Sequence, residues 1–173
     1  MDSPDAFRSR PQFRRGRAAE EVVAKRFREH GWLTIHTNAF GGDEGDERPS
    51  LKGKDADFAL PDLFLARSGQ SRWLEVKLKS KPALDARAGK PVHGISARLI
   101  CEYQKVQAET GIPVVLAILE EDSRTLLVER LDELLDKGRY CGADTLHKGG
   151  TWFFVRDAFG RQWDMSGIGE VSP

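Results

Sequence analysis

Apolar positions dominate residues 61–77, where two short stretches rich in Leu, Phe, Trp and Val are joined by Ser68 and Gly69. Short apolar runs around a Ser-Gly pair predict a β-hairpin with its turn at those two residues. Side chains alternate across a strand, so Glu75 and Lys77 share one face of the second strand and the apolar residues between them take the other. The hairpin therefore carries charged groups on an otherwise apolar element.

Helical periodicity predicts one helix on each side of this hairpin. Residues 18–30 carry an apolar stripe that ends at Gly31, and a second helix is expected from Ser96, as N-cap, to Gly111. Four further strands are predicted at residues 32–36, 113–119, 125–128 and 151–155, and a short helix at 130–137. Residues 41–54 and 82–94 are predicted to be loops, and residues 120–123 a turn. The pattern indicates a mixed α/β domain.

The length of 173 residues fits a single domain. We expect a flexible basic arm at residues 1–15, one domain at 16–165 and a frayed tail at 166–173. The two cysteines, Cys101 and Cys141, have neither metal-ligand spacing nor the pattern of a disulfide framework, and no apolar run is long enough to span a bilayer. These features predict a cytoplasmic protein.

The 27 basic and 27 acidic residues give a formal net charge of zero, which argues against a protein that coats nucleic acid along its whole surface. The charges are nevertheless segregated along the chain. Basic residues follow the second hairpin strand, where we expect them to contact phosphate groups: Lys77, Lys79, Lys81, Arg87 and Lys90.

Asp62, Glu75 and Lys77 place two carboxylates and an ammonium group within the hairpin. Charges on an apolar element cost free energy unless they neutralise one another or bind something. Carboxylate oxygens suit Mg²⁺ or Mn²⁺, and an adjacent ammonium group could orient a water molecule or offset developing charge. A half-buried salt bridge at a sheet edge is the alternative. Asp62 is expected near the open end of the hairpin, so that a bulge would be needed to bring it beside Glu75.

Pro61-Asp62, followed 13 positions after Asp62 (75 − 62) by Glu75-Val76-Lys77, resembles the motif of the PD-(D/E)xK nuclease superfamily, which includes restriction endonucleases and Holliday junction resolvases. The resemblance implies an α/β fold with a restriction-endonuclease-like αβββαβ core, in which helices flank a mixed central sheet. It also implies metal-dependent hydrolysis of phosphodiester bonds in DNA, and a homodimer, since superfamily members are frequently dimers.

By this resemblance, Asp62 and Glu75 would hold Mg²⁺, with Mn²⁺ as a substitute, together with the backbone carbonyl of Val76. Lys77 would position or activate the attacking water. Asp57 and Asp55 are rivals for the role of Asp62, because the spacing between the two acids varies within the superfamily.

The family often supplies a further acid from its first helix. Glu20 lies about 100° from Ala19 on the helical wheel, at the flank of the apolar stripe, whereas Glu21 lies about 200° away and faces solvent. Glu20 is therefore the candidate fourth ligand. Gln104, in the second helix, resembles the polar residue that many members place there, where it would orient a water or a phosphate oxygen.

Nothing in the sequence reads as a recognition helix with base-reading side chains, which favours cleavage directed by DNA structure or by ends. Two alternatives stay open. One is a catalytically inactive module of the same fold that binds DNA or a protein, and the other is a structural protein whose hairpin charges form a salt bridge.

Overall fold

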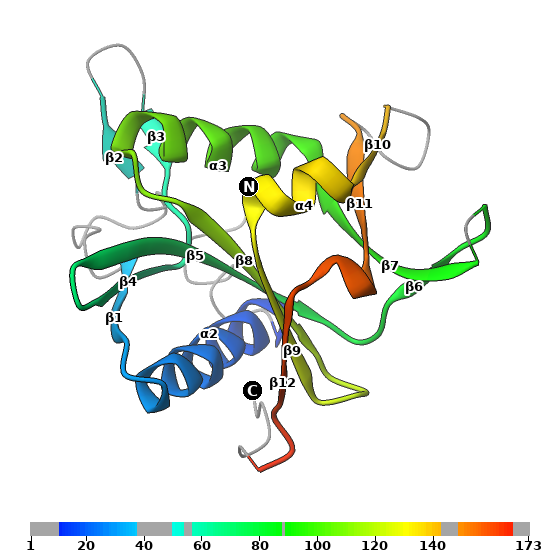
Figure 1. The fold of residues 1–173 in the computed structure, drawn as a ribbon, viewed down its shortest axis with the longest axis horizontal. Helices are drawn as coiled ribbons and strands as arrows, with labels where there is room; N and C mark the ends of the chain where they lie inside the picture. The colour runs from blue at the N-terminus through cyan, green and yellow to red at the C-terminus, as the bar shows by residue number, and fades with distance from the viewer. Residues whose placement is uncertain (1–10, 38–49, 54–56, 88, 143–148, 168–173) are drawn as a thin grey trace.

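A mixed six-stranded sheet forms the centre of the computed structural model, which describes residues 11–37, 50–53, 57–87, 89–142 and 149–167 (Figure 1). Its strands, in spatial order, are β1 (Leu33–His36), β4 (Leu63–Arg67), β5 (Gln70–Lys79), β8 (Val114–Glu120), β9 (Thr125–Arg130) and β12 (Arg161–Asp164). β5 and β8 are parallel, and the other neighbours are antiparallel.

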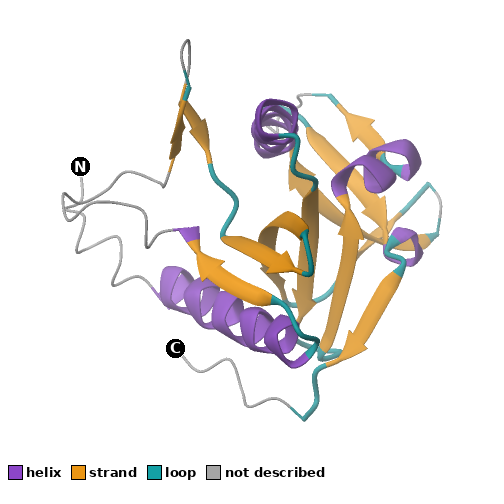
Figure 2. Cartoon of the chain, turned by 60° about the vertical axis from the view of Figure 1, so that its left-hand side comes forward, coloured by secondary structure: helices purple, strands orange, loops and turns teal. Residues whose placement is uncertain are grey.

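Helices cover both faces of this sheet (Figure 2). On one face, α2 (Pro11–Glu29) packs Val23 and Phe27 into the core, and on the other α3 (Ala97–Thr110) and α4 (Leu131–Lys137) bury Tyr103 and Leu134. Every residue of β8 is buried, because a strand covered on both faces contributes alternate side chains to two cores. This three-layer arrangement confirms the predicted fold class. None of the helices among the described residues is long and apolar enough to cross a membrane.

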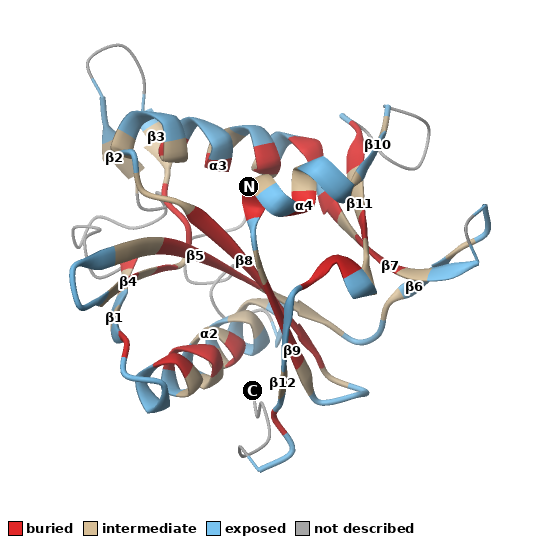
Figure 3. Cartoon of the chain, in the orientation of Figure 1, coloured by how far each residue is buried: buried red, intermediate tan, exposed pale blue. Residues whose placement is uncertain are grey.

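Two smaller sheets flank the central one. One has the order β10 (Arg139–Cys141), β11 (Thr151–Val155), β7 (Lys90–Ser96) and β6 (Ala83–Asp85), and the other pairs β2 (Ser50–Lys52) with β3 (Asp57–Ala59). Residues 86, 87, 89 and 90 of the β6–β7 hairpin are exposed (Figure 3). A short 3-10 helix, η2 (Arg156–Ala158), links β11 to β12.

The predicted hairpin is confirmed as β4 and β5, joined by Ser68 at φ 47° and Gly69 at φ 77°. Two successive residues with positive φ are typical of the tight turn whose twist matches that of paired strands. The second predicted helix is confirmed as α3, which ends at Gly111 in the left-handed conformation.

The N-terminal boundary differs from the prediction, because α2 already begins at Pro11. Proline is well accommodated in the first turn of a helix, and residues 11–15, assigned to the basic arm, are helical. Residues 1–10 of the arm and 168–173 of the tail lie outside the described residues, as do residues 41–49 of the acidic loop.

Other predictions were wrong where pairing is non-local. Residues 82–94 contain β6 and most of β7 rather than a loop, since β7 pairs with the distant β11 and thereby buries Val92 and Ile95. Glu120 lies at the end of β8 instead of in a turn, and β12 was not predicted at all.

Candidate active site

Asp62 and Glu75 lie opposite each other across the β4–β5 ladder. The antiparallel register pairs Leu63 with Leu74, so the residue before Leu63 faces the residue after Leu74. The Val76 backbone N–H donates a hydrogen bond of 2.8 Å to Oδ2 of Asp62. The expectation that a bulge would be needed is therefore wrong, because the plain register brings the two acids together.

Thr37 fixes the backbone that carries Asp62. Its N–H donates to the Asp62 carbonyl at 3.0 Å and its hydroxyl donates to the Pro61 carbonyl at 2.6 Å. Thr37 is buried, so these bonds are shielded from water. Sequence reasoning missed this residue, which lies one position beyond β1 and carries no motif signal.

Glu75 and Lys77 project from the same face of β5, as the alternation predicts. Glu75 is fully buried, and the Lys77 ammonium contacts its Oε1 oxygen. The Lys77 side chain is 26% exposed, which leaves the ammonium group accessible from a neighbouring cavity. The pair thus joins a buried carboxylate to a cation at the surface.

Glu20 enters the same region from α2. Its side chain is 13% exposed and forms an ion pair of 3.0 Å with Arg17, whereas the Glu21 side chain is 59% exposed and pairs with Arg28. The helical-wheel argument therefore distinguished the two glutamates as the structure does. His36 lies beside both, with Nε2 2.9 Å from Glu21 and Nδ1 3.9 Å from Glu20.

A cavity of about 380 Å³ brings these elements together. An ion pair between Arg15 and Glu121 lies at its wall. The cavity joins the first turns of α2 to the end of the hairpin, and the remaining residues that line it are Gln12, Phe13, Gly16, Arg17, Glu20, Asp62, Val76, Lys77, Leu78 and Ser80.

The electrostatics of the site destabilise the ionised form of Asp62. Burial, followed by the negative charge of Glu75, raises the pKa of Asp62 to about 8; the Glu20 charge adds to this effect, and Lys77 opposes it. On the same strand, burial and the nearby Lys77 charge lower the pKa of Lys79. A carboxylate that its neighbours repel gains from binding either a proton or a cation.

The donor set fits a hard divalent cation in chemistry, since it consists of carboxylates and the Val76 carbonyl. It is not assembled as it stands: no three His, Cys, Asp or Glu side chains in the described part of the chain converge to hold a metal ion. The Glu75 carboxylate faces Lys77 and the Glu20 carboxylate faces Arg17. Metal binding at this site would require these ion pairs to loosen.

Three candidate residues from the sequence remain, and the two that the structure describes lie away from the cavity. Asp57 is exposed on the β2–β3 hairpin and pairs with Lys52 at 2.5 Å, and Asp55 lies outside the described residues. Gln104 is exposed on α3 and does not line the cavity. One turn later, Gln107 accepts a hydrogen bond of 2.9 Å from the Val114 N–H, so it anchors the start of β8.

A second buried polar cluster, which sequence reasoning missed, surrounds Glu120 at the end of β8. Its carboxylate accepts hydrogen bonds from His93 Nε2 at 2.8 Å, Ser123 at 2.6 Å and Arg156 at 3.1 Å. Burial raises the pKa of the Glu120 carboxyl, but these hydrogen bonds outweigh it and hold the pKa below its usual value. The cluster ties the central sheet to β7 and η2.

Comparison with known proteins shows the fold. No family model and no curated protein matches the chain. The structure of Hjc, a Holliday junction resolvase from the archaeal hyperthermophile Archaeoglobus fulgidus, is similar with a TM-score of 0.54 and 10% identity, over 88% of this chain and 93% of that one. D212, a nuclease from a fusellovirus, gives a TM-score of 0.41 and 11% identity, over 82% and 79% of the two chains.

Proposed function

We propose that this protein is a metal-dependent DNA nuclease that hydrolyses phosphodiester bonds. The observation that carries the proposal is the opposition of Asp62 and Glu75 across the ladder, with Lys77 beside them at a cavity. A shared fold with a Holliday junction resolvase supports DNA as the substrate. The motif resemblance and the geometry therefore point to the same residues.

Asp62, Glu75 and the Val76 carbonyl would hold Mg²⁺ or Mn²⁺, with Glu20 as a further ligand. When bound, the ion would offset phosphate charge and polarise the scissile group. Because the pKa of Asp62 is about 8, its carboxyl must lose its proton before it takes a cation. The Val76 N–H keeps one oxygen of Asp62 oriented toward β5.

Lys77 would act once its ammonium group is released from Glu75. From the cavity wall it can donate a hydrogen bond to the attacking water or to a phosphate oxygen, which stabilises the charge that develops during hydrolysis. Loss of a single such donor typically costs two to three decades in rate.

The exposed cations that follow β5 in the chain would supply a surface for the DNA backbone. Lys81, Arg87 and Lys90 are exposed in the segment of the β6–β7 hairpin, and Asp85 there is paired with Arg139 at 2.9 Å. A local basic surface is compatible with a neutral chain because phosphate contacts depend on local charge.

The test is cleavage of labelled linear duplex, single strand, nicked duplex and four-way junction in Mg²⁺ or Mn²⁺. Wild type should cut at least one substrate, while Glu75→Gln and Asp62→Asn should not. Asp57→Asn is the matched control, because Asp57 is exposed and outside the cavity. Cleavage that survives in Asp62→Asn but not in Asp57→Asn would transfer the role of first acid to Asp57.

A binding module of the same fold is the second candidate, and the ion pairs that occupy Glu75 and Glu20 favour it. It predicts metal-independent binding to one of these DNAs without cleavage. Binding alone, with no product in either metal, would replace the nuclease proposal.

A further inference from the structure

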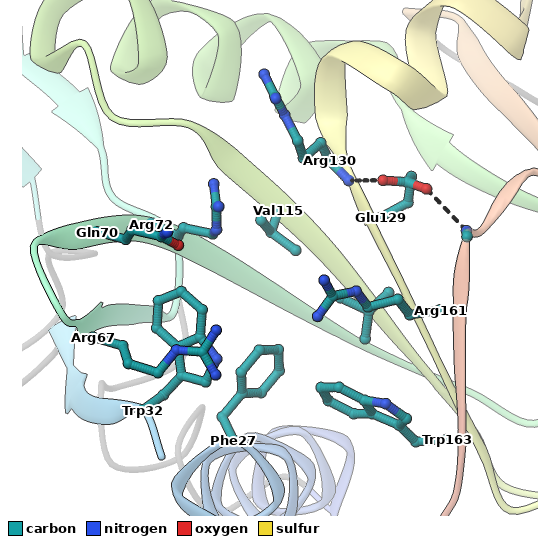
Figure 4. A pocket seen from close by; sticks show the side chains of 12 residues that line it. Phe27, Trp32, Arg67, Gln70, Arg72, Val115, Glu129, Arg130, Arg161 and Trp163 are labelled. Atoms are coloured by element: carbon teal, nitrogen blue, oxygen red, sulfur yellow. Dashed lines mark hydrogen bonds between the residues drawn. The ribbon is translucent and has the colours of Figure 1, made fainter. Parts of the chain in front are cut away.

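A second cavity, of about 370 Å³, lies at the opposite end of β5 from the candidate active site. It opens between the end of α2, the β4–β5 turn and the strands β9 and β12 (Figure 4). Its volume lies in the range of about 300–1,000 Å³ that is usual for small-molecule sites. Nothing in the proposed nuclease chemistry uses it.

Three guanidinium groups give this cavity a positive charge. Arg67 and Arg161 point toward its centre, and Arg72 lies on its β5 wall (Figure 4). The carboxylate at the cavity belongs to Glu129, so these four side chains sum to +2 (3 − 1). The side chain of Arg130 points away and pairs with Asp132.

Two of the arginines form no ion pair with a carboxylate of a described residue. Arg67 stacks over Trp32 at 4.5 Å and donates to the His30 carbonyl at 2.9 Å. Arg72 and Arg161 have no carboxylate partner among the residues that the structure describes, and Arg72 reaches the ring of Trp32 only at 5.8 Å. The Glu129 oxygens accept from the backbone N–H groups of Arg130 at 2.8 Å and Gly160 at 2.9 Å, and the charge of +2 remains after Glu129 is included.

The opposite wall of the cavity is aromatic. Phe27 and Trp163 meet edge to face at 5.1 Å, and His30 stacks on Trp163 at 4.7 Å, which fixes the indole. Trp163 is partly buried, and the Arg26 guanidinium also lies 5.9 Å from its ring centre, so a ligand can contact only the part of the indole that stays exposed. An aromatic surface and a guanidinium plane both stack on nucleobases without selecting a sequence.

We propose that this cavity binds a single nucleotide unit, with the phosphate on Arg161 and Arg72 and the base against Trp163. Contact with Trp163 requires a base that has left the duplex stack, which restricts the ligand to an unpaired nucleotide. Two sources share this chemistry: a free nucleoside monophosphate and a nucleotide within a DNA strand.

The position of the cavity favours a nucleotide within a strand. Both cavities adjoin α2, since Glu20 lines the first and Phe27 the second, and seven helical positions span about 10 Å. A short single strand can span this separation, so a nucleotide in the second cavity would leave the adjoining DNA near the candidate active site. This extension rests on the proposed nuclease function and names its substrate class, DNA with unpaired nucleotides, whereas nucleotide binding itself does not depend on catalysis.

Intrinsic fluorescence provides a direct test, because two of the four tryptophans, Trp32 and Trp163, line the cavity. Glu75→Gln protein in EDTA would be titrated with thymidine monophosphate, thymidine and a short oligothymidylate. We expect quenching by both phosphorylated ligands, and at least tenfold weaker binding in Arg161→Gln and in Arg72→Gln. Arg98→Gln, which removes an exposed arginine of α3 on the far face of the sheet, should bind normally.

The outcomes of this titration distinguish the two sources of the nucleotide and test the site itself. Quenching by the oligonucleotide that is tighter than by the monophosphate supports a strand, and quenching by the monophosphate alone supports a free nucleotide. Equal binding by Arg161→Gln, Arg72→Gln and Arg98→Gln, with unchanged thermal unfolding, would overturn the site. Since the protein is inactive and metal-free, failure here leaves the nuclease proposal standing, and absence of cleavage by the wild type leaves the nucleotide site standing.

Discussion

Asp62 faces Glu75 across the β4–β5 ladder, and its carboxylate accepts a hydrogen bond from Val76, the next residue of β5. Two acids are thereby held on neighbouring strands within a partly apolar environment. Such a pair has a free-energy cost when both are ionised, and that cost makes the site measurable before any substrate is added.

Without metal, the protein should lose stability as pH rises through the pKa of Asp62. The pKa rises from 3.8 to about 8 on folding, so the native state holds a proton that the unfolded state releases between these values. Asp62→Asn removes this penalty. In EDTA its melting temperature should exceed that of wild type by a few degrees at pH 8.5, with a smaller gap at pH 5, whereas Asp57→Asn should follow wild type at both.

Mg²⁺ or Mn²⁺ should raise the melting temperature of the wild type according to mass action. The rise should be larger at pH 8.5 than at pH 6.5, because Asp62 must be ionised to act as a ligand. Glu75→Gln should show little of it. A wild type that does not respond to either metal would favour a purely structural salt bridge at Glu75 and Lys77.

Lys77→Met should slow cleavage by about two decades or more. It should also destabilise the metal-free protein by about 3 kcal/mol, because Glu75 is fully buried and would lose its cation. Lys77→Arg keeps the charge and should retain most of the stability. Chemical denaturation in EDTA and single-turnover cleavage separate the two effects; a Lys77→Met protein with wild-type cleavage would exclude the catalytic role.

Glu120→Ala should destabilise the fold by about 3–5 kcal/mol, since it leaves Arg156 without its carboxylate in a partly buried cluster. Asp122, two residues after Glu120, is exposed, and Asp122→Asn serves as the matched control with a change within about 0.5 kcal/mol. Urea denaturation measures both. Equal stability of the two variants would mean that the cluster adds nothing to the fold.

The sequence predicted elements whose signals are local. The β4–β5 hairpin, α3 and β8 follow from turn residues, helical periodicity and a continuous apolar run, each within a short window. The strands β7 and β12 were not predicted, because their hydrogen-bonding partners β11 and β9 lie far along the chain. Pairing of that kind stabilises a segment that has no strand pattern of its own.

The candidate site was predicted in the same uneven way. Asp62, Glu75 and Lys77 were identified from a motif, and the strand period placed Glu75 and Lys77 on one face, but a bulge was expected where the plain register brings Asp62 beside Glu75. The prediction of Glu20 depended in addition on its position on the helical wheel. Thr37 and the Glu120 cluster were missed because their roles depend on backbone carbonyls and on partners from other strands, which no single window contains.

The parallel pairing of β5 with β8 has a consequence for how this protein tolerates change. β5 pairs with β4 over Gln70–Leu74 and with β8 over Trp73–Lys79, so a neighbouring strand holds its register along its whole length. Inserting one residue between Arg72 and Glu75 would turn every later side chain of β5 to the opposite face of the sheet, sending Glu75 and Lys77 into the layer under α2. Inserting two residues would return each side chain to its original face but lengthen β5 between Arg72 and Lys77 by about 7 Å. The number of residues between Arg72 and Lys77 is therefore constrained by the alternation of side chains between the two faces of the sheet.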